Sequence, residues 1–462
     1  MKNFDKLDKK MVELFESSRK ELLKDSTVEL DNLLKMEQYL KEIDKKIDEL
    51  ELLKANFGRI YDYTSLKQKG FNKTELEKFI EEDSKYIERI DEYYLKNLRR
   101  RNYMFGYPAN MEDYSYTTMY LRYLESKMYL MNNCGDPYQR GNYRMDSKAI
   151  EKEILSLMAE NFGLKENNYW GYITSGGTES NYWGIREGFS RFPKGKLYFS
   201  EDTHYSVEKY VFDGENKTRY PYAKIKSDKY GCILLDNLLR QISIDKENGY
   251  EGVILVLTWG TTVRGAIDNV KEITSKLEEL SIPYYCHLDA ALFGGIPKNQ
   301  VNAPYIENIQ EYGIDSIAVS MHKYMGTARV NGALLTLRRN DRKVIDYIGQ
   351  EDSTLLGSRD LLPFSTLQRI KEVLLRQEEN HFNKNVEYLE NKLIENKIQY
   401  EKFNNSNIFV IDKPCNEVCK KYQLASFKEE DGSEKAHIIA FPFHKQEIID
   451  ELVKDLLRGN ND

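Results

Sequence analysis

Short runs rich in β-branched and aromatic residues alternate with amphipathic stretches from about residue 140 onward, and this alternation restricts the fold more than any other feature. Helix-like stretches, among them 178–190 and 269–280, separate the strand-like runs. Strands that are separated by helices need crossover connections, so we expect an α/β fold with a mainly parallel sheet. A ligand then binds at the carboxyl ends of the strands. The strand-like runs are KLYFS at 196–200, VILVLT at 253–258, YYCHLD at 284–289, DSIAVS at 315–320 and GALLTL at 332–337.

The two flanking regions have other patterns. From residue 1 to about 100, Lys, Glu, Asp and Leu dominate and apolar residues recur at helical spacing, which predicts a helical extension that serves as a packing or dimerisation arm. From about residue 341 the sequence favours a small α+β region. Its helix-like stretches lie around 362–382 and 445–457, and its strand-like runs are NIFVID at 407–412 and AHIIAF at 436–441.

Charge and composition argue against several classes of protein. The longest apolar runs, such as VILVL at 253–257, are far shorter than the roughly 20 residues that cross a bilayer, and the first residues lack the apolar segment of a signal peptide. A net charge of −7 is mild for 462 residues and argues against a large nucleic-acid footprint. The five cysteines lack metal-ligand spacing. We therefore expect a cytoplasmic protein without a membrane, nucleic-acid or metal partner.

The segment TSGGTESN at 174–181 places two glycines and a hydroxyl residue where a helix begins. Glycines let a backbone come close to a ligand, and the free N–H groups at a helix N-terminus attract anions. Gly176, Gly177 and Thr178 are therefore candidates for a phosphate-binding site.

Two charged residues follow apolar strand-like runs. Burial of Lys323, just after 315–320, would lower the pKa of its amine, as Schiff-base chemistry requires; the alternative is an ordinary surface lysine. Asp289 ends the run 284–289, where a desolvated carboxylate needs a cationic partner such as a protonated pyridine nitrogen; the alternative is a helix N-cap. His287 shares a strand face with Asp289 and is either its partner or a plain buried histidine.

A phosphate cup, an aspartate at one strand end and a lysine after a later strand are together what pyridoxal 5′-phosphate requires. In this interpretation Asp289 pairs with the pyridine nitrogen, which lets the ring act as an electron sink, and Lys323 meets the aldehyde carbon. The phosphate is held by Gly176, Gly177 and Thr178.

With these residues in place, the chain resembles the group II pyridoxal phosphate-dependent decarboxylases, and within them the bacterial histidine decarboxylases and their plant serine decarboxylase relatives. The likeness covers about three quarters of the chain and depends on an ordered series of motifs. These are FGYPANMEDY at 105–114, NNCGDP at 132–137, WGYITSGGTESN at 170–181, DTHYSVEK at 202–209, GTTVRGAIDNV at 260–270, HLDAALFGG at 287–295, SMHKYMG at 320–326 and EDSTLLGSR at 351–359.

The resemblance implies the aspartate-aminotransferase-like fold (PLP fold type I), a pyridoxal 5′-phosphate cofactor and decarboxylation of an L-amino acid to its amine and CO₂. Combined with the flanking patterns, it predicts three parts. They are a helical N-terminal extension at 1–104, a large pyridoxal phosphate-binding domain at 105–340 and a small α+β C-terminal domain at 341–462.

The resemblance also implies roles for single residues. The histidine that matches His204 stacks on the cofactor ring and helps to orient the substrate carboxylate, while Ala291 supports the other ring face. Thr262 neighbours the oxygen side of the ring. Ser320 and His322 approach the phosphate beside the lysine, so His322 is expected to be a phosphate neighbour rather than a general base.

The stretch 346–360 resembles a mobile loop that lies near the active site of the neighbouring subunit, which implies an obligate homodimer with shared active sites. Thr354 and Ser358 are then expected to reach the partner's phosphate, and Tyr347 is a weaker candidate proton donor. The alternative is an exposed polar loop without a role in the site.

Histidine is the leading substrate by resemblance, but three departures from the family pattern leave others open. Met321 replaces a small residue, GTARVNG at 326–332 replaces a proline-containing segment, and SRDL at 358–361 replaces SRNG. The alternatives are serine, an aromatic or acidic amino acid, or a biosynthetic intermediate as substrate. Aldehyde formation and C–C cleavage are alternative outcomes on the same fold, and a non-catalytic scaffold is the alternative of another class.

Overall fold

The computed structural model describes residues 100–126, 131–166, 168–212, 219–337, 344–359 and 363–459, together with scattered positions between 72 and 97. The chain divides into two compact units, Met1–Lys96 and Asn97–Asp462. The helical extension that the sequence predicts over 1–104 lies almost entirely outside the described residues, so it stays a prediction.

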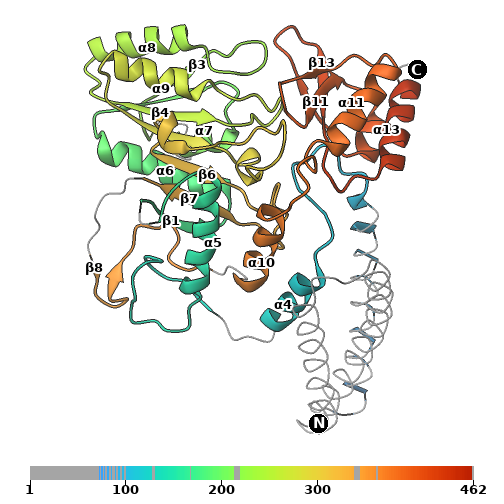
Figure 1. Ribbon diagram of the computed structural model, residues 1–462, viewed down its shortest axis with the longest axis horizontal. Helices are drawn as coiled ribbons and strands as arrows, with labels where there is room; N and C mark the ends of the chain where they lie inside the picture. The colour runs from blue at the N-terminus through green and yellow to red at the C-terminus, as the bar shows by residue number, and fades with distance from the viewer. Residues whose placement is uncertain are drawn as a thin grey trace. The chain divides into compact units, whose positions relative to one another are not determined.

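A seven-stranded sheet in the order β1-β7-β6-β5-β4-β2-β3 lies at the centre of the unit Asn97–Asp462 (Figure 1). The strands are β1 (Trp170–Thr174), β2 (Lys196–Ser200), β3 (Tyr222–Ile225), β4 (Val253–Thr258), β5 (Tyr284–Asp289), β6 (Ser316–Val319) and β7 (Gly332–Thr336). The adjacent strands β6, β5, β4, β2 and β3 pair in parallel, whereas β7 pairs antiparallel with both β6 and β1. The prediction of an α/β fold with a mainly parallel sheet is thus confirmed.

The antiparallel strand β7 was not foreseen, and the short connection before it explains its direction. Residues 320–331 link β6 to β7 through turns and bends and contain no helix. A parallel return needs a longer crossover, usually through a helix, so a short connection sends the chain back antiparallel. This connection carries Lys323.

Helices cover the sheet, and the covered strands have continuous apolar sequences. All six residues of β4 are buried, as is typical of a strand covered on both faces. In α9, Val270, Ile273, Thr274 and Leu277 are buried at helical spacing, which places them on one face toward the core. The helices of this region are α4 (Tyr116–Ser126), α5 (Lys148–Asn161), α6 (Gly177–Arg191), α7 (Tyr205–Val211), α8 (Leu235–Glu247) and α9 (Val270–Glu279), with short 3₁₀ turns η1 (Phe293–Gly295) and η2 (Ile309–Tyr312).

The C-terminal region is α+β, as predicted. A four-stranded antiparallel sheet in the order β10-β11-β13-β12 lies beside α11 and α13, which contact each other (Figure 1). The elements are β8 (Val344–Ile345), β9 (Gln350–Glu351), α10 (Pro363–Leu374), α11 (Lys384–Glu395), β10 (Glu401–Lys402), β11 (Ile408–Asp412), α12 (Asn416–Lys421), β12 (Ala425–Lys428), β13 (Glu434–Ile439) and α13 (Gln446–Gly459). The domain boundaries at 104 and 340 stay predictions.

None of the helices in the described part of the chain combines the length and the apolarity that crossing a bilayer requires.

Candidate active site

The predicted aspartate and lysine lie at the same edge of the central sheet. Asp289 is the last residue of β5, which pairs in parallel with β6, and Asp289 is in register with Ala318. Strand β6 ends at Val319, and Lys323 lies in the turn that follows it. Two neighbouring parallel strands therefore deliver both charged groups to their carboxyl ends, where ligands bind in sheets of this kind.

Lys323, Asp289 and His204 act on one another electrostatically. Burial lowers the pKa of the Lys323 amine, and the negative charge of Asp289 opposes that shift. Burial likewise lowers the pKa of His204, with Asp289 opposing the shift and Lys323 adding to it. A lowered pKa increases the fraction of neutral amine at neutral pH, and the neutral amine is the nucleophilic form.

The glycine turn before α6, formed by Gly176 and Gly177, lies against residues that follow β5 and β6. Gly176 has φ 136° and ψ 174°, a conformation open essentially to glycine alone. The Gly177 N–H donates to Ser320 Oγ at 3.0 Å. A Cβ on Gly177 would lie 2.7 Å from Ser320 Oγ and 3.4 Å from Ala291 Cβ. The helix N-terminus, Ser320 and Ala291 thus converge, and only glycine allows so close an approach at this position.

His322 lies next to the same turn. A Cβ on Gly176 would be 3.7 Å from His322 Cε1. The Nδ1 of His322 donates to the Asn331 carbonyl at 2.8 Å, because a carbonyl oxygen can only accept. Burial lowers the pKa of His322, the Asn331 bond opposes this shift and the Lys323 charge adds to it. A neutral His322 therefore has Nε2 as its acceptor nitrogen. Thr178 is half-buried in the first turn of α6.

Thr262 is the predicted site residue with the weakest structural connection. It lies exposed on the turn after β4, at the same edge of the sheet as Asp289. Its neighbour Thr261 is buried and accepts at Oγ1 from the Ala266 N–H at 3.0 Å. Among the described residues, no hydrogen bond joins the Thr262 side chain to Asp289 or Lys323.

Asn181 belongs to the site, although the sequence did not single it out. Its Nδ2 lies 2.7 Å from Asp289 Oδ2 and 3.2 Å from Ser206 Oγ, and its Oδ1 lies 3.0 Å from His287 Nε2. His287, expected beside Asp289, therefore reaches it through this amide. The available signal was spacing, since Asn181 follows Gly177 by one helical turn and shares its face of α6.

The segment predicted to approach a neighbouring subunit is tied to its own chain. Thr354 is buried, and its Oγ1 donates to Asp352 Oδ1 at 2.6 Å. Ser358 Oγ accepts a bond from Asn132 Nδ2 at 3.1 Å. Tyr347 is 84% exposed. The expected contacts of Thr354, Ser358 and Tyr347 with a partner subunit stay predictions.

A buried ion pair anchors the end of this segment. Arg359 Nη2 lies 3.2 Å from Glu151 Oε2, and the two side chains are 3% and 0% exposed. Asn133 Nδ2 and the Ile173 N–H also donate to this carboxylate, at 2.7 and 2.9 Å. Breaking such a pair would leave a buried charge uncompensated, so the residues before Arg359 are held firmly against α5 and β1.

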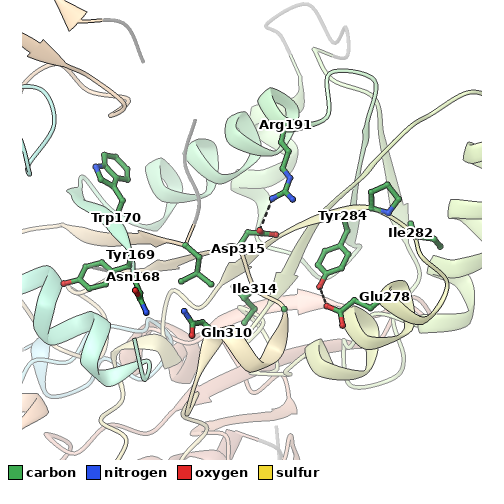
Figure 2. A pocket seen from close by; sticks show the side chains of 13 residues that line it. Asn168, Tyr169, Trp170, Arg191, Glu278, Ile282, Tyr284, Gln310, Ile314 and Asp315 are labelled. Atoms are coloured by element: carbon green, nitrogen blue, oxygen red, sulfur yellow. Dashed lines mark hydrogen bonds and ion pairs between the residues drawn. The ribbon is translucent and has the colours of Figure 1, made fainter. Parts of the chain in front are cut away.

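A cavity of about 870 Å³ lies at the opposite edge of the sheet (Figure 2). Tyr284, the first residue of β5, and Asp315, directly before β6, are part of its lining. Its charged groups already pair, since Arg191 Nη1 lies 3.2 Å from Asp315 Oδ1 and Tyr284 donates to Glu278 at 2.8 Å (Figure 2). This cavity is therefore separate from the carboxyl edge that carries Asp289.

The features at the carboxyl edge fit pyridoxal 5′-phosphate. A helix N-terminus behind two glycines suits a phosphate group. A carboxylate and a desolvated amine that act on each other suit the pyridine nitrogen and the aldehyde. The absence of a side chain at Gly177 lets the start of α6 approach Ser320 and Ala291, which follow the two strand ends, so the phosphate and ring contacts assigned to these residues lie close together.

Comparisons with known proteins agree with this fit. Residues 192–354 match the family model for the pyridoxal-dependent decarboxylase conserved domain. The histidine decarboxylase of Pseudomonas entomophila (strain L48) is 33% identical over 80% of this chain and 90% of its own length. The histidine decarboxylase of Klebsiella aerogenes is 33% identical over 80% of this chain and 96% of its own.

Solved structures share the fold. The L-methionine decarboxylase from Streptomyces sp. 590 is similar with a TM-score of 0.66 and 22% identity, over 84% of this chain and 95% of that one. Mouse CSAD is similar with a TM-score of 0.60 and 18% identity, over 77% of this chain and 83% of that one.

Proposed function

Because this chain belongs to the pyridoxal-dependent decarboxylase family and is a pyridoxal 5′-phosphate-dependent amino acid decarboxylase, we propose that its substrate is L-histidine, which it converts to the amine and CO₂. One observation carries the choice of substrate: relatives that are 33% identical over 80% of the chain are histidine decarboxylases. Structural likeness to a methionine decarboxylase at 22% identity speaks for the fold alone.

Two of the three departures from the family pattern are compatible with an intact site. Met321 is fully buried and packs in the hydrophobic core. In the segment that lacks the family's proline, Thr327 Oγ1 donates to Asn331 Oδ1 at 2.6 Å, and the Asn331 carbonyl accepts from His322. This hydrogen bond restrains the connection after the lysine in the absence of a proline ring. The third departure, SRDL at 358–361, extends beyond the described residues.

We assign the cofactor contacts to residues of the carboxyl edge. When bound, pyridoxal 5′-phosphate supplies an electron sink for the bond that releases CO₂. Lys323 provides a neutral amine for the aldehyde carbon, and Asp289 keeps a proton on the pyridine nitrogen. His204 and Ala291 hold the two faces of the ring, and His204 orients the substrate carboxylate. The remaining contacts are Thr262 near the ring oxygen and, around the phosphate, Gly176, Gly177, Thr178, Ser320 and His322.

A substrate screen tests this function. Purified protein with pyridoxal 5′-phosphate is given histidine, serine, methionine, and aromatic and acidic amino acids, while CO₂, amine and aldehyde are followed by mass spectrometry. We expect histamine and CO₂ in equal amounts, with kcat/KM for histidine at least about tenfold above the others, the scale that substrate contacts supply. A higher kcat/KM for another amino acid would reject histidine, and aldehyde as the main product would reject simple decarboxylation.

We further propose a homodimer with shared active sites. Large apolar side chains lie exposed beside the site: Val330, which is close to Gly176, is 70% exposed, and Tyr205, which follows His204, is 67% exposed. Exposed apolar groups beside a functional site favour a contact with another protein surface. Sedimentation equilibrium is expected to give twice the 54.4 kDa chain mass. A fully active species with the mass of one chain would contradict the dimer.

A further inference from the structure

We propose that Asn181 is a positioning residue that holds Asp289 and His204 in place for the cofactor, and that His287 fixes the orientation of the Asn181 amide. The inference deepens the proposed function and rests on the cofactor contacts assigned there to Asp289 and His204. It assigns a role in the site to a side chain on α6 that is 1% exposed.

The contacts of Asn181 satisfy its whole amide group. The Nδ2 atom lies 2.7 Å from Asp289 Oδ2 and 3.2 Å from Ser206 Oγ. The Oδ1 atom lies 3.0 Å from His287 Nε2. Two of these partners lie on β5, at its end and in its middle, and the third lies at the start of α7, so the side chain of Asn181 joins α6 to two other elements.

Donor and acceptor chemistry fixes the direction of each bond in this network. An ionised carboxylate only accepts, so the amide NH₂ must face Asp289 and the amide oxygen must face His287. The Nε2 atom of His287 then donates, and Nδ1 of a neutral ring accepts from Ser316 Oγ at 2.7 Å. Tyr285 donates in turn to Ser316 Oγ at 2.8 Å. The hydrogen bonds thus form a chain that begins at Tyr285 and ends at Asp289. In it Ser316, His287 and Asn181 each accept from the group before and donate to the next.

The charge state of His287 is consistent with this direction. Its side chain is fully buried, and burial lowers its pKa to about 4, although the charge of Asp289 opposes the shift. The ring is therefore neutral near pH 7, with one donor nitrogen and one acceptor nitrogen.

A second branch of the network reaches His204. The Ser206 N–H donates to His204 Nδ1 at 3.3 Å, which identifies Nδ1 as an acceptor. The Ser206 hydroxyl, 2.8 Å from the same nitrogen, therefore donates to it and accepts from the Asn181 NH₂. The proton of a neutral His204 ring is then on Nε2. Through this hydroxyl, Asn181 orients the ring that we place on the cofactor.

Packing against α6 fixes the place of the His287 ring. A Cβ on Gly184, less than one turn after Asn181 on α6, would lie 2.2 Å from His287 Nδ1. The imidazole therefore fits against the helix only where a side chain is missing. Glycine inside a helix is less favourable than alanine, so the close approach of ring and helix offsets a local penalty.

The consequence for Asp289 follows from its remaining bonds. Its Oδ1 accepts from the Ala291 N–H at 3.2 Å, and its Oδ2 accepts from Asn181. Hydrogen bonds to a carboxylate favour its charged form and fix its rotamer. Without the Asn181 donor, the buried carboxylate keeps only the Ala291 N–H as a hydrogen-bond donor among the described residues and is free to rotate away from the pyridine nitrogen.

The first experiment measures cofactor affinity in the full-length chain. We expect Asn181→Leu, which keeps the branched shape and removes the donor, to weaken pyridoxal 5′-phosphate binding at least about tenfold in a titration of cofactor-free protein. Asn181→Asp, which keeps the shape but turns an acceptor toward Asp289, should weaken it at least as much. A residue that only fills space would show the reverse order, with Asn181→Asp close to wild type.

A matched control separates this effect from the general loss of a buried amide. Asn161 is 7% exposed and bonds to Ile296 and Lys298 through its side chain, away from Asp289. We expect Asn161→Leu to lower the unfolding temperature while cofactor affinity stays within twofold of wild type. Wild-type affinity in folded Asn181→Leu would overturn the positioning role.

The second experiment needs no known substrate, and its result is measured on the wild-type protein. Nitrogen-15 NMR of the histidine side chains in cofactor-free wild-type protein reports which ring nitrogen carries the proton, and His287→Gln assigns the signal among the six histidines. We expect a neutral His287 ring protonated at Nε2 at pH 7. A ring protonated at Nδ1, or at both nitrogens, would overturn the proposed orientation. Because this result is independent of turnover, failure of the histidine screen would leave it standing.

Discussion

Lys323→Ala is expected to abolish amine formation from every amino acid in the screen, with a rate at least ~10³-fold below wild type. The reason is the position of Lys323, which follows β6 at the carboxyl edge. Burial lowers the pKa of its amine and the charge of Asp289 acts on it, as covalent binding of an aldehyde needs. Amine and CO₂ are measured with saturating pyridoxal 5′-phosphate. Some cofactor should still bind, because the assigned phosphate and pyridine contacts are unchanged.

The control for this variant is Lys194→Ala. Lys194 is 70% exposed and pairs with Glu251 on the surface, so its loss should leave the rate within twofold of wild type. Binding of pyridoxal 5′-phosphate to Lys323→Ala, measured by equilibrium dialysis, shows that the variant is folded. Amine formation at a tenth of the wild-type rate or more would remove Lys323 from its assigned role.

Asp289→Ala is expected to lower both cofactor affinity and turnover, each by at least about tenfold. The change removes the carboxylate assigned to the pyridine nitrogen, and it also leaves the Asn181 NH₂ and the Ala291 N–H without their acceptor. Asp289→Asn keeps the shape of the side chain without its charge. We expect this variant to lower turnover more than it lowers the stability of the fold. Affinity is measured by cofactor titration, and turnover by amine release.

Asp245→Ala provides the matched control for a buried carboxylate. Asp245 is 3% exposed and bonds to Lys196 and Tyr198, remote from the strand ends that carry the site. Its loss should reduce stability without changing cofactor affinity in the folded protein. Full cofactor occupancy together with a wild-type rate in Asp289→Ala would contradict the pyridine assignment.

The parts of the fold that could be predicted are those with a local signal. Strands β2, β4 and β5 lie at the predicted residues, and α6 and α9 differ from prediction by one residue at each end, because continuous apolar runs and helical spacing are properties of neighbouring residues. Strands β1 and β3 were not singled out. The direction of β7 was missed because pairing direction depends on the connection between strands, and apolar runs look alike in either direction.

The candidate site was predictable to a similar extent. The charged and glycine residues stand out because they follow apolar strand-like runs or precede a helix, and because together they match what one cofactor requires. Asn181 gave no such signal, since an asparagine inside a helix is most often an ordinary polar residue. Ser206 and Ser316 are equally inconspicuous, and they gain a role only through the ring nitrogens beside them.

What the sequence by itself determined is therefore the set of chemical groups and the strand ends that carry them: an amine, a carboxylate and a glycine turn before a helix. Local patterns encode these features, so they can be read without coordinates. Only the tertiary structure decided that one amide links Asp289, His287 and Ser206, and hence which nitrogen of each histidine carries the proton. Hydrogen bonds act over about 3 Å between elements distant along the chain, and no sequence period records that distance.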